Sequence, residues 1–488
     1  MGDPIFLFRT YILDIFFVNN YILSYKWFLQ DYKGGIKHTK GDEIMKFKVF
    51  LVSFLFLFMG SILLSQAVAS EYNESWPTWR GPLFSGEAVK GNPPTVWSET
   101  ENVKWKVPIP GSGLSTPVIW GDQIFITSTV STDKKAPASA QAKPKAGGWM
   151  QPKLPEYIQQ FVVYSIDRNT GKIIWQKTVS EQFPHEGTHN DGTWASPSCV
   201  TDGEHLIASF GSYGLYCFDL KGNLIWEKDL GDLFIRMAFG EGSSPALYKK
   251  YLIVKWDHEK DSYIYVLNKT NGDIIWKKSR DEATSWSTPL VVPVNGKDQL
   301  IVTATKKSIA YDLENGDIIW EVSGMTENVI PSPLTDGELA YLISGFRGAA
   351  LQAVKLDGAK GDLKDSAALV WTYNKNTPYV PSALLYNNRL YYLRGNDARL
   401  SCLESKTGKI NYETQKLDDM KGVYASPVAA NGFVYVLGRQ GMCYVLKDGN
   451  EFNVVSKNVL DDRFDASPAI VGNNIYLRGH KNLYCISE

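Results

Sequence analysis

The sequence predicts an all-β protein, an eight-bladed β-propeller made of four-stranded antiparallel blades. Two motifs that alternate along the 488 residues predict it. The first is a turn followed by an apolar strand that carries an aromatic residue, as in NTGKIIW at Asn169–Trp175. The second is Ser or Thr followed by Pro ahead of an apolar strand, and Ser382-Ala383 takes the same place once. Spacings of mostly about 45 residues between the second motifs are typical of propeller blades. The second motif begins at Thr116, Ser196, Ser244, Thr288, Ser332, Ser426 and Ser467.

One repeat shows how a blade is built. Strand a is expected at Pro245–Tyr248, strand b at Tyr251–Trp256, strand c at Ser262–Asn268 and strand d at Asp273–Lys277. The turn motif is therefore the hairpin between strands c and d, where Asn or Asp caps its own backbone and Gly accepts a positive φ. A large ring on strand d fills the gap between neighbouring blades, which widens away from the axis. We expect this role for Trp175, Trp226, Trp276, Trp320, Trp371 and Tyr412.

The last repeat ends without a strand d of its own. Near the start of the propeller, NVKWKVPI at Asn102–Ile109 has the pattern of a strand d that no hairpin precedes. We expect this N-terminal strand to complete the eighth blade, with Trp105 as its docking residue. Such a closure leaves no open sheet edge between the first and the last blade.

The N-terminal part carries an export signal. From Met45 a short basic stretch precedes an apolar run, and small residues at 67–69 fit a cleavage site. We therefore interpret 1–44 as an over-extended start, 45–69 as a signal peptide, 70–100 as an N-terminal extension and 101–488 as the propeller. The protein is expected in the periplasm or outside the cell, and the alternative is a membrane anchor formed by an uncleaved signal.

Composition excludes some functions and marks one insert. The net charge of −1 provides no field that would attract nucleic acid or an anionic membrane. Cys217, Cys402, Cys443 and Cys485 lie at similar places in their repeats and indicate small buried side chains, and no Cys/His spacing predicts a metal site.

Residues 131–157 are rich in Lys, Ala and Pro and predict a flexible insert in the first blade, with a lid over the mouth as the alternative. We expect a monomer.

Several turn motifs share a longer pattern. DRNTGKIIW at Asp167–Trp175 fits Asp-x-x-Thr-Gly-x-x-x-Trp, and LNKTNGDIIW and YDLENGDIIW lie close to it. The sequence thereby resembles the pyrroloquinoline-quinone (PQQ) repeat superfamily of eight-bladed propellers, over nearly the whole chain from Trp76 onward. WPTWRGP, GEGSSPALY and SGFRGAAL add a resemblance to secreted bacterial PQQ-like propellers of unassigned activity. The superfamily holds quinoprotein alcohol dehydrogenases and a non-enzymatic propeller of the outer-membrane assembly machinery, so the resemblance implies the fold more than the function.

The sequence departs from both of these relatives. Quinoprotein dehydrogenases stack PQQ against a ring formed by adjacent, disulfide-bonded cysteines, and no two cysteines are adjacent here. Their calcium ligands have no residue-by-residue counterpart in this chain. The assembly propeller is usually lipid-anchored through a Cys that is missing here. We therefore predict a binding or scaffold module rather than an enzyme, without an assigned cofactor, and a PQQ- and calcium-dependent oxidoreductase is the alternative.

The candidate site is the mouth of the central funnel. In a propeller, the d–a connections and the b–c turns share one face and surround this mouth. Aromatic and charged residues just before the Ser/Thr-Pro motifs predict a ligand-binding surface there. For the aromatic residues, mutual packing that plugs the funnel is an equal alternative. The candidates are Trp194, Glu241, Trp286, Asn328, Tyr379, Tyr424, Arg463 and Asp465.

Four arginines occupy b–c turns in four successive repeats. Guanidinium groups match carboxylates and phosphates, so a semicircle of them predicts a small anionic ligand. The tricarboxylate PQQ, an acidic glycan and a peptide carboxylate all fit this description. The alternative is that each arginine pairs with a neighbouring Asp or Glu. The four are Arg347, Arg394, Arg439 and Arg478.

Two loops, Phe183–Trp194 and Trp256–Asp261, hold histidines beside carboxylates. An acid–base pair, a metal site or a glycan-active centre would need these side chains to converge in the mouth. Solvated polar surface is the reading that we favour. The secondary candidates are His185, His189, Asp191, His258 and Glu259. The partner expected at the funnel face is a small anionic ligand, a glycan or a protein.

Overall fold

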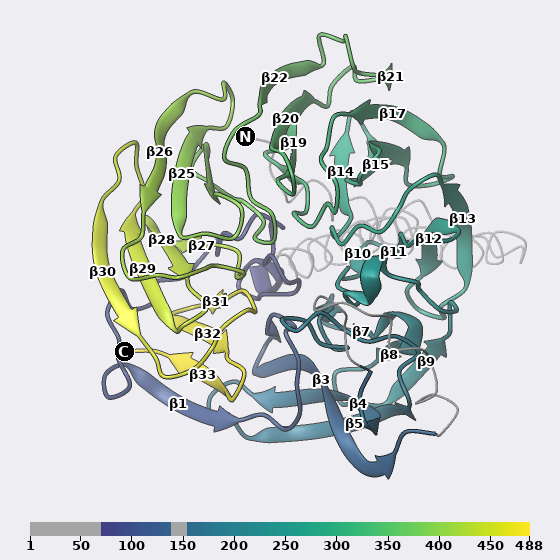
Figure 1. Ribbon diagram of the computed structural model, residues 1–488, viewed down its shortest axis with the longest axis vertical. Helices are drawn as coiled ribbons and strands as arrows, with labels where there is room; N and C mark the ends of the chain where they lie inside the picture. The colour runs from purple at the N-terminus through teal and green to yellow at the C-terminus, as the bar shows by residue number, and fades with distance from the viewer. Residues whose placement is uncertain (1–69, 138–153) are drawn as a thin grey trace, which may run out of the picture. The chain divides into compact units, whose positions relative to one another are not determined.

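The structure is a computed structural model that describes residues 70–137 and 154–488. The predicted signal peptide and the segment before it lie outside the described residues. Residues Glu74–Glu488 form one compact unit. This unit is an all-β propeller of eight sheets set around a central axis (Figure 1), which confirms the predicted fold class. A search of the described residues for a helix with the length and hydropathy of a membrane span finds none.

Each blade runs outward from the axis through strands a, b, c and d. The innermost strands are β2 (Val118–Trp120), β6 (Val200–Thr201), β10 (Ala246–Tyr248), β14 (Leu290–Val294), β18 (Leu334–Thr335), β23 (Leu384–Tyr386), β27 (Val428–Ala430) and β31 (Ala469–Val471). The second strands are β3 (Gln123–Lys135), β7 (Leu206–Ser209), β11 (Tyr251–Trp256), β15 (Lys297–Val302), β19 (Leu339–Ser344), β24 (Arg389–Leu393), β28 (Phe433–Leu437) and β32 (Asn474–Arg478). The third strands are β4 (Tyr157–Asp167), β8 (Leu215–Phe218), β12 (Ser262–Asn268), β16 (Lys307–Asp312), β20 (Ala350–Lys355), β25 (Arg399–Glu404), β29 (Met442–Lys447) and β33 (Asn482–Ile486). The outermost strands are β5 (Ile173–Gln182), β9 (Leu224–Lys228), β13 (Ile274–Arg280), β17 (Ile318–Ser323), β22 (Leu369–Tyr373), β26 (Ile410–Lys416), β30 (Val454–Val459) and β1 (Val103–Pro108).

The eighth blade is built from both ends of the propeller, as predicted. β1 pairs antiparallel with β33, with Trp105 opposite Cys485 and Val107 opposite Leu483. The two strands lie side by side in Figure 1, where the colours of the two ends of the chain meet. The sheet order β1-β33-β32-β31 closes the ring without a free edge between the first and the last blade.

The Trp and the Gly of the turn motif come from different repeats and meet across the boundary between neighbouring blades. The indole of a docking Trp lies against the turn Gly of the next blade, and its Nε1 donates a hydrogen bond to a backbone carbonyl of the same hairpin. Trp226 donates to the carbonyl of Lys269 at 2.8 Å and packs on Gly272. A Cβ on Gly272 would lie 2.8 Å from the Trp226 ring, so only Gly fits. The same pairing joins Trp105 to Gly171, Trp175 to Gly222, Trp276 to Gly316 and Trp371 to Gly408.

Trp320 departs from this pairing because the next blade has a longer c–d connection. Its Nε1 donates to Oε1 of Gln299 in the same blade, at 3.0 Å, and its side chain is completely buried. From the long connection a short strand, β21 (Gly361–Asp362), pairs in parallel with β17 and extends that sheet to five strands. Trp320 therefore fills a closed interior position instead of docking on a turn.

The hydroxyl groups of the second motif connect the blades around the axis. At each step the backbone N–H of one residue donates to the hydroxyl oxygen of the equivalent residue in the next blade, at 2.8–3.3 Å. These bonds run from Thr116 through Ser198, Ser244, Thr288, Ser332, Ser382 and Ser426 to Ser467. In the second blade this place is taken by Ser198, two residues after the Ser of the Ser-Pro motif, and the Ser196 hydroxyl instead donates to the carbonyl of Thr193 in the preceding turn.

The N-terminal extension crosses the inner strands. Backbone hydrogen bonds tie residues 76–92 to β2, β6, β23, β27 and the end of β31, near the ends where these strands turn into strand b. The guanidinium of Arg80 is buried and donates to the carbonyls of Ser85, Ala383 and Pro427 at 2.8–2.9 Å. Burial lowers the pKa of Arg80 to about 9. The extension is thus an integral part of the propeller.

The insert in the first blade is shorter than predicted. β3 continues to Lys135, which pairs with Tyr157 at the start of β4. The two ends of the range 131–157 are therefore strand, and its residues 138–153 lie outside the described residues. All five cysteines are buried and none forms a disulfide.

Candidate functional site

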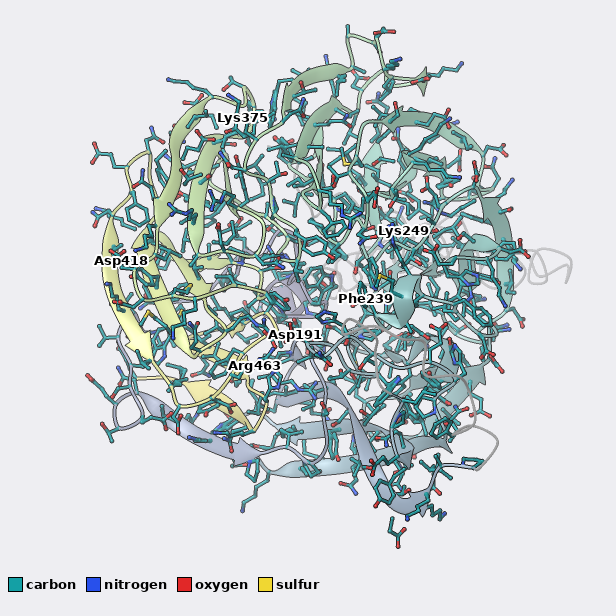
Figure 2. The ribbon with its side chains drawn as sticks, viewed as in Figure 1. Asp191, Phe239, Lys249, Lys375, Asp418 and Arg463 are labelled. Carbon is teal, nitrogen blue, oxygen red and sulfur yellow. The ribbon has the colours of Figure 1, made fainter. Side chains whose placement is uncertain are left out.

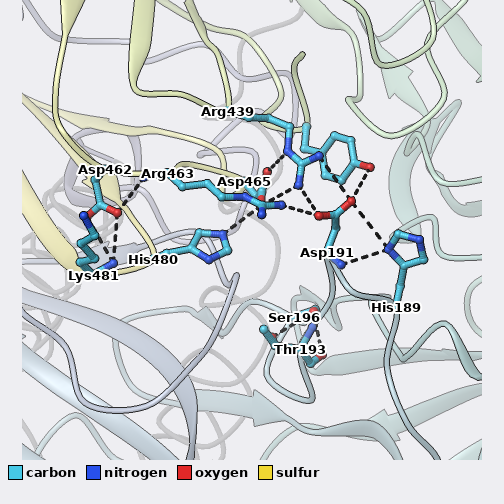
Figure 3. Close-up of polar contacts among 11 residues, drawn as sticks. His189, Asp191, Thr193, Ser196, Arg439, Asp462, Arg463, Asp465, His480 and Lys481 are labelled. Carbon is cyan, nitrogen blue, oxygen red and sulfur yellow. Dashed lines mark hydrogen bonds and ion pairs between the residues drawn. The ribbon is translucent and has the colours of Figure 1, made fainter. Parts of the chain in front are cut away.

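Six polar side chains meet at the centre of the loop face (Figure 3). Arg439 and His480 lie in b–c turns, and Tyr424, Arg463 and Asp465 lie in connections that lead into strands a. Asp191 comes from the loop between β5 and β6, and Figure 2 places it near Arg463 at the middle of the ring. We call these residues the mouth cluster: Asp191, Tyr424, Arg439, Arg463, Asp465 and His480.

Asp465 is the buried anchor of the mouth cluster. Its side chain is 1% exposed. It accepts hydrogen bonds from Nε of Arg439 at 2.6 Å and from Nε of Arg463 at 3.0 Å. Nε2 of His480 lies 2.9 Å from the same carboxylate. A buried carboxylate with three cationic or polar partners holds those partners in fixed positions.

Asp191 joins distant parts of the ring. One of its carboxylate oxygens lies 2.7 Å from Nη2 of Arg439 and also contacts Nη2 of Arg463. The other accepts the hydroxyl of Tyr424 at 3.2 Å. The partners are 233 to 272 residues away along the chain. The loop after the first blade is thereby linked to the seventh blade and to the connection into the eighth.

The electrostatics of the mouth cluster favour its ion pairs. Burial opposes the charged form of Arg439, but the Asp465 and Asp191 carboxylates outweigh burial and raise the pKa of its guanidinium. Burial and the charge of Asp191 raise the pKa of Tyr424 to about 12, so its hydroxyl stays protonated and donates. The Arg439 guanidinium lies 3.8 Å from the centre of the Tyr424 ring.

The four predicted arginines do not form a semicircle of free cations. Arg439 belongs to the mouth cluster, and Arg394 forms an ion pair with Asp397. Arg478 is buried, donates to the hydroxyl and carbonyl of Ser115, and has its pKa lowered by burial to about 9. Arg347 alone of the four has a side chain that is 70% exposed, at 4.0 Å from Glu327. The alternative of pairing with a neighbouring carboxylate therefore describes Arg394 and Arg439.

The predicted histidine loops separate into two groups. His189 lies with Asp191, whose backbone N–H donates to Nδ1 of His189 at 3.1 Å. His185 and His258 instead support residues 230–242, which connect β9 to β10 and include the 3-10 turn η2 (Arg236–Ala238). Nε2 of His185 lies 2.8 Å from the carbonyl of Leu233, and Nδ1 of His258 accepts from the N–H of Phe234 at 3.0 Å.

Glu259 is also committed to the backbone, since it accepts from the N–H of Thr284 at 3.2 Å. These groups therefore hold loop backbone instead of facing one another as an acid and a base. No group of three His, Cys, Asp or Glu side chains that could hold a metal occurs within residues 70–137 and 154–488.

Glu241 ties two loops together. Its carboxylate accepts from the N–H of Ser212 at 2.8 Å and from the Ser212 hydroxyl, which lies in the 3-10 turn η1 (Gly211–Tyr213). The Ser212 hydroxyl in turn accepts from the N–H of Leu233 at 2.7 Å. Burial raises the pKa of Glu241 to about 8, and the nearby charges of Glu186 and Asp232 add to this. The loop 230–242 is thereby fixed to the adjacent b–c turn.

A buried ionic network beneath this loop was not predicted from the sequence. The Lys255 ammonium donates to the hydroxyls of Ser285 and Ser287 at 2.8 and 3.0 Å, and burial lowers its pKa to about 7. Asp257 pairs with Arg280 at 2.7 Å. The one signal in the sequence was a Lys within the apolar strand LIVKW. A cavity of about 20 Å³ between this network and Glu241 has room for a single water.

The aromatic candidates mostly pack within the loop face. Nε1 of Trp194 donates to the carbonyl of Glu186, and Nε1 of Trp286 to the carbonyl of Gly240. Tyr379 stacks on Phe346 at 4.7 Å. Asn328 is buried and adopts a positive φ of 52°. The tryptophans thus fasten the loops that surround the mouth.

PQQ would need free cations for its carboxylates and a slot of the size of its ring system. Of the predicted arginines, Arg394 and Arg439 are already paired with carboxylates, and the cysteines lie apart as free buried thiols. The cavity beside Glu241 has room for one water. A pocket with a volume of about 470 Å³ lies elsewhere, between the N-terminal extension and the end of β31, and Lys90 and Arg168 line it.

Comparisons with known proteins agree on the repeat family. A PQQ-repeat family model described as outer membrane protein assembly factor BamB matches residues 260–488. The tetrathionate hydrolase of Acidithiobacillus ferrooxidans is 22% identical over 297 residues, which are 56% of this chain and 53% of that protein, so the chain spans about half the length of that relative. The outer membrane protein assembly factor BamB of Yersinia pestis is 22% identical over 334 residues, which are 65% of this chain and 77% of that protein.

Two solved structures match this chain in part. The crystal structure of BamB from Moraxella catarrhalis covers 74% of this chain and 96% of its own, at 12% identity and a TM-score of 0.46. The computationally designed Ika8 protein covers 70% of this chain and 98% of its own, at 9% identity and a TM-score of 0.46. The repeated motifs, the eight blades and the match over residues 260–488, which are a little under half of the chain, make this chain similar to the PQQ-repeat propellers.

Proposed function

We propose that this chain is an exported, non-catalytic propeller that binds a protein partner through its loop face. The observation that supports this most directly is how the polar groups of that face are used. His185, His258 and Glu259 hold backbone, and the mouth cluster consists of mutually paired charges. Groups arranged in this way shape a surface, whereas catalysis needs an acid or base aimed at a reacting atom.

The names of the relatives give limited guidance. One is named as a hydrolase and another as an assembly factor, so the resemblance alone does not decide between an enzyme and a scaffold. The way in which the loop-face polar groups are used favours the scaffold. On this face the loop 230–242 presents Met237 with half of its surface exposed, beside Arg236, which pairs with Glu327 at 3.1 Å. A protein that docks on the loop face would cover Met237.

Site-specific photo-crosslinking in the native host tests the proposal. A photoreactive amino acid is placed at Met237 on the loop face or, as a control, at Ile225 on the outer strand β9, where the side chain has a similar exposure. We expect a specific adduct with another protein from position 237 and none from position 225. Adducts from position 225 alone would contradict a loop-face partner.

A second measurement tests the non-catalytic part. The purified protein is mixed with PQQ and calcium and assayed for dye-linked oxidation of alcohols and sugars. We expect no turnover above that of the protein without PQQ. Turnover that depends on PQQ would contradict the proposal and favour the quinoprotein alternative.

A further inference from the structure

We infer that the mouth cluster without Asp191 is a receptor for a carboxylate group, and that Asp191 of the chain itself occupies this receptor in the structure. The occupant that displaces Asp191 is a peptide segment rich in Asp or Glu. This inference rests on the proposed function, because it names the chemistry by which the loop face recognises its partner.

Asp191 is held as a bound ligand would be held. Nη2 of Arg439 lies 2.7 Å from its first carboxylate oxygen, which Nη2 of Arg463 also contacts. The Tyr424 hydroxyl and Nη1 of Arg439 lie 3.2 and 3.4 Å from the second oxygen. Two guanidinium groups and a hydroxyl that converge on one carboxylate form a charge-assisted recognition site.

The receptor is built independently of its internal occupant. Asp465 accepts hydrogen bonds from the Nε atoms of Arg439 and Arg463, at 2.6 and 3.0 Å. The Nη2 atoms of both arginines lie between the two carboxylates, at 3.3 and 3.0 Å from Asp465 and in contact with Asp191. The Tyr424 ring supports the Arg439 guanidinium at 3.8 Å. These contacts remain when Asp191 leaves. Two guanidinium groups then face one remaining carboxylate, and an incoming anion restores the balance of charge.

Asp191 comes from a surface turn. His189 and Asn190 before it are exposed, and Asp191 itself keeps about a quarter of its side chain in solvent. The turn is closed internally, by hydrogen bonds from Gly192 N–H to the His189 carbonyl and from Asp191 N–H to the His189 ring. It is anchored to the loop 230–242 by the His189 N–H, which donates to the carbonyl of Phe239 at 3.1 Å. Displacement of the whole turn therefore has to break that hydrogen bond.

The occupant is expected to carry several carboxylates. Arg463 contacts Asp191 and yet its side chain is 42% exposed, so a cationic side chain of the receptor reaches solvent beside the bound carboxylate. A single small acid would engage only the buried part. A peptide with successive acidic side chains matches both the receptor and its exposed surroundings.

The test removes the internal competitor. In Asp191→Asn the side chain keeps its size and loses its charge, so the receptor is freed at little steric cost. Hexaglutamate binding is measured by calorimetry at low ionic strength for the wild type and the variant. We expect the variant to bind at least about tenfold more tightly, because the binding-competent state no longer competes with Asp191. Equal affinity of the two proteins overturns the inference.

Three comparisons make the result specific. Adding Arg439→Gln to the variant should abolish the gain, and a gain that persists overturns the inference. Hexaglutamine should not bind, and equal binding would show that the carboxylates are irrelevant. If trigalacturonate binds Asp191→Asn and hexaglutamate does not, the occupant is an acidic glycan and the inference of a peptide is overturned.

A measurement on the wild type covers the case in which the variant fails to fold. Saturating hexaglutamate should displace the turn and speed hydrogen exchange of the backbone at 185–191. Unchanged or slower exchange there contradicts displacement. Crosslinking from Met237 remains independent of these results, so a failed receptor and a failed loop-face function are distinguishable.

Discussion

At the scale of single residues, two carboxylates of the loop face lie in opposite environments. Asp465 is surrounded by two guanidinium groups and an imidazole. Glu241 is surrounded by the hydroxyl and N–H of Ser212, with the further carboxylates Glu186 and Asp232 nearby. The first arrangement stabilises a negative charge, whereas the second disfavours it because no cation compensates for burial.

Glu241→Gln should remove a pH dependence of stability. The pKa of Glu241 is raised from its ordinary 4.5 to about 8 in the folded protein. The folded state therefore binds more protons than the unfolded state between these values, and the wild type loses stability as pH rises through them. Chemical unfolding measures the unfolding free energy of both proteins. We expect the value for the wild type minus the value for the variant to be smaller at pH 9 than at pH 5. A constant difference would contradict the protonated carboxyl.

The same comparison separates the contribution of Glu241 to the pH dependence of stability from that of Lys255. Burial lowers the pKa of Lys255 from 10.5 to about 7, so its contribution to stability rises with pH between these values. Lys255 is present in both proteins, and its effect cancels in the difference between them.

The residues of the site could be predicted from the sequence only in part. The position rule for d–a and b–c loops found Tyr424, Arg439, Arg463 and Asp465, because loop position follows from a regular repeat. It did not find His480, two residues after Arg478 in the same turn, nor the role of Asp191. His480 meets Asp465 of the connection into its own blade, whereas the partners of Asp191 lie in other blades. A repeat pattern carries no information on which loop side chains meet.

At the scale of elements, the c–d hairpin of one repeat packs on the strand-d Trp of the preceding repeat. Each turn Gly was predicted from its conformation alone, with a positive φ as the reason. The structure adds a second reason, since the indole of the preceding blade occupies the place of a side chain. The turn and its Gly could be predicted from the local sequence. Which Trp packs on which Gly could not, because the two residues lie in different repeats.

Gly272→Ala and Gly296→Ala separate these two reasons. Both glycines have positive φ, +71° and +80°. A Cβ at position 272 meets the Trp226 ring at 2.8 Å, whereas at position 296 it meets nothing within 4 Å. Both variants carry backbone strain, and Gly272→Ala should lose about 1–3 kcal/mol more in urea unfolding because of overpacking. Equal losses would mean that the indole contact is unimportant.

At the scale of the whole molecule, three devices hold the ring together. Docking tryptophans act near the rim, the hydroxyl chain from Thr116 to Ser467 acts around the axis, and residues 76–92 tie blades across the ring. Sequence repetition predicted the first device and the number of blades. The hydroxyl chain joins equivalent residues of neighbouring blades, but the repeat pattern does not say which atoms meet. The extension depends on contacts with non-equivalent segments, which repetition does not encode.

Trp76→Ala tests the contribution of the extension. Trp76 is completely buried and its backbone pairs with Ile119 of β2. Loss of a buried Trp side chain leaves a cavity and should cost about 3–5 kcal/mol of unfolding free energy. Val89→Ala, at a residue that is 40% exposed in the same extension, is the control and should cost little. Thermal unfolding followed by tryptophan fluorescence and circular dichroism measures both; a variant as stable as the control would mean that the extension contributes nothing.

The pairing of β1 with β33 imposes an order on biosynthesis. A ribosome makes β1 before the other strands of the propeller and makes β33 after them. Until β33 has been made, the growing chain carries β1 without a pairing partner, and the first blade has no neighbour on one side. Such a nascent chain is vulnerable to pairing with other copies of itself, and the synthesis of β33 ends that exposure.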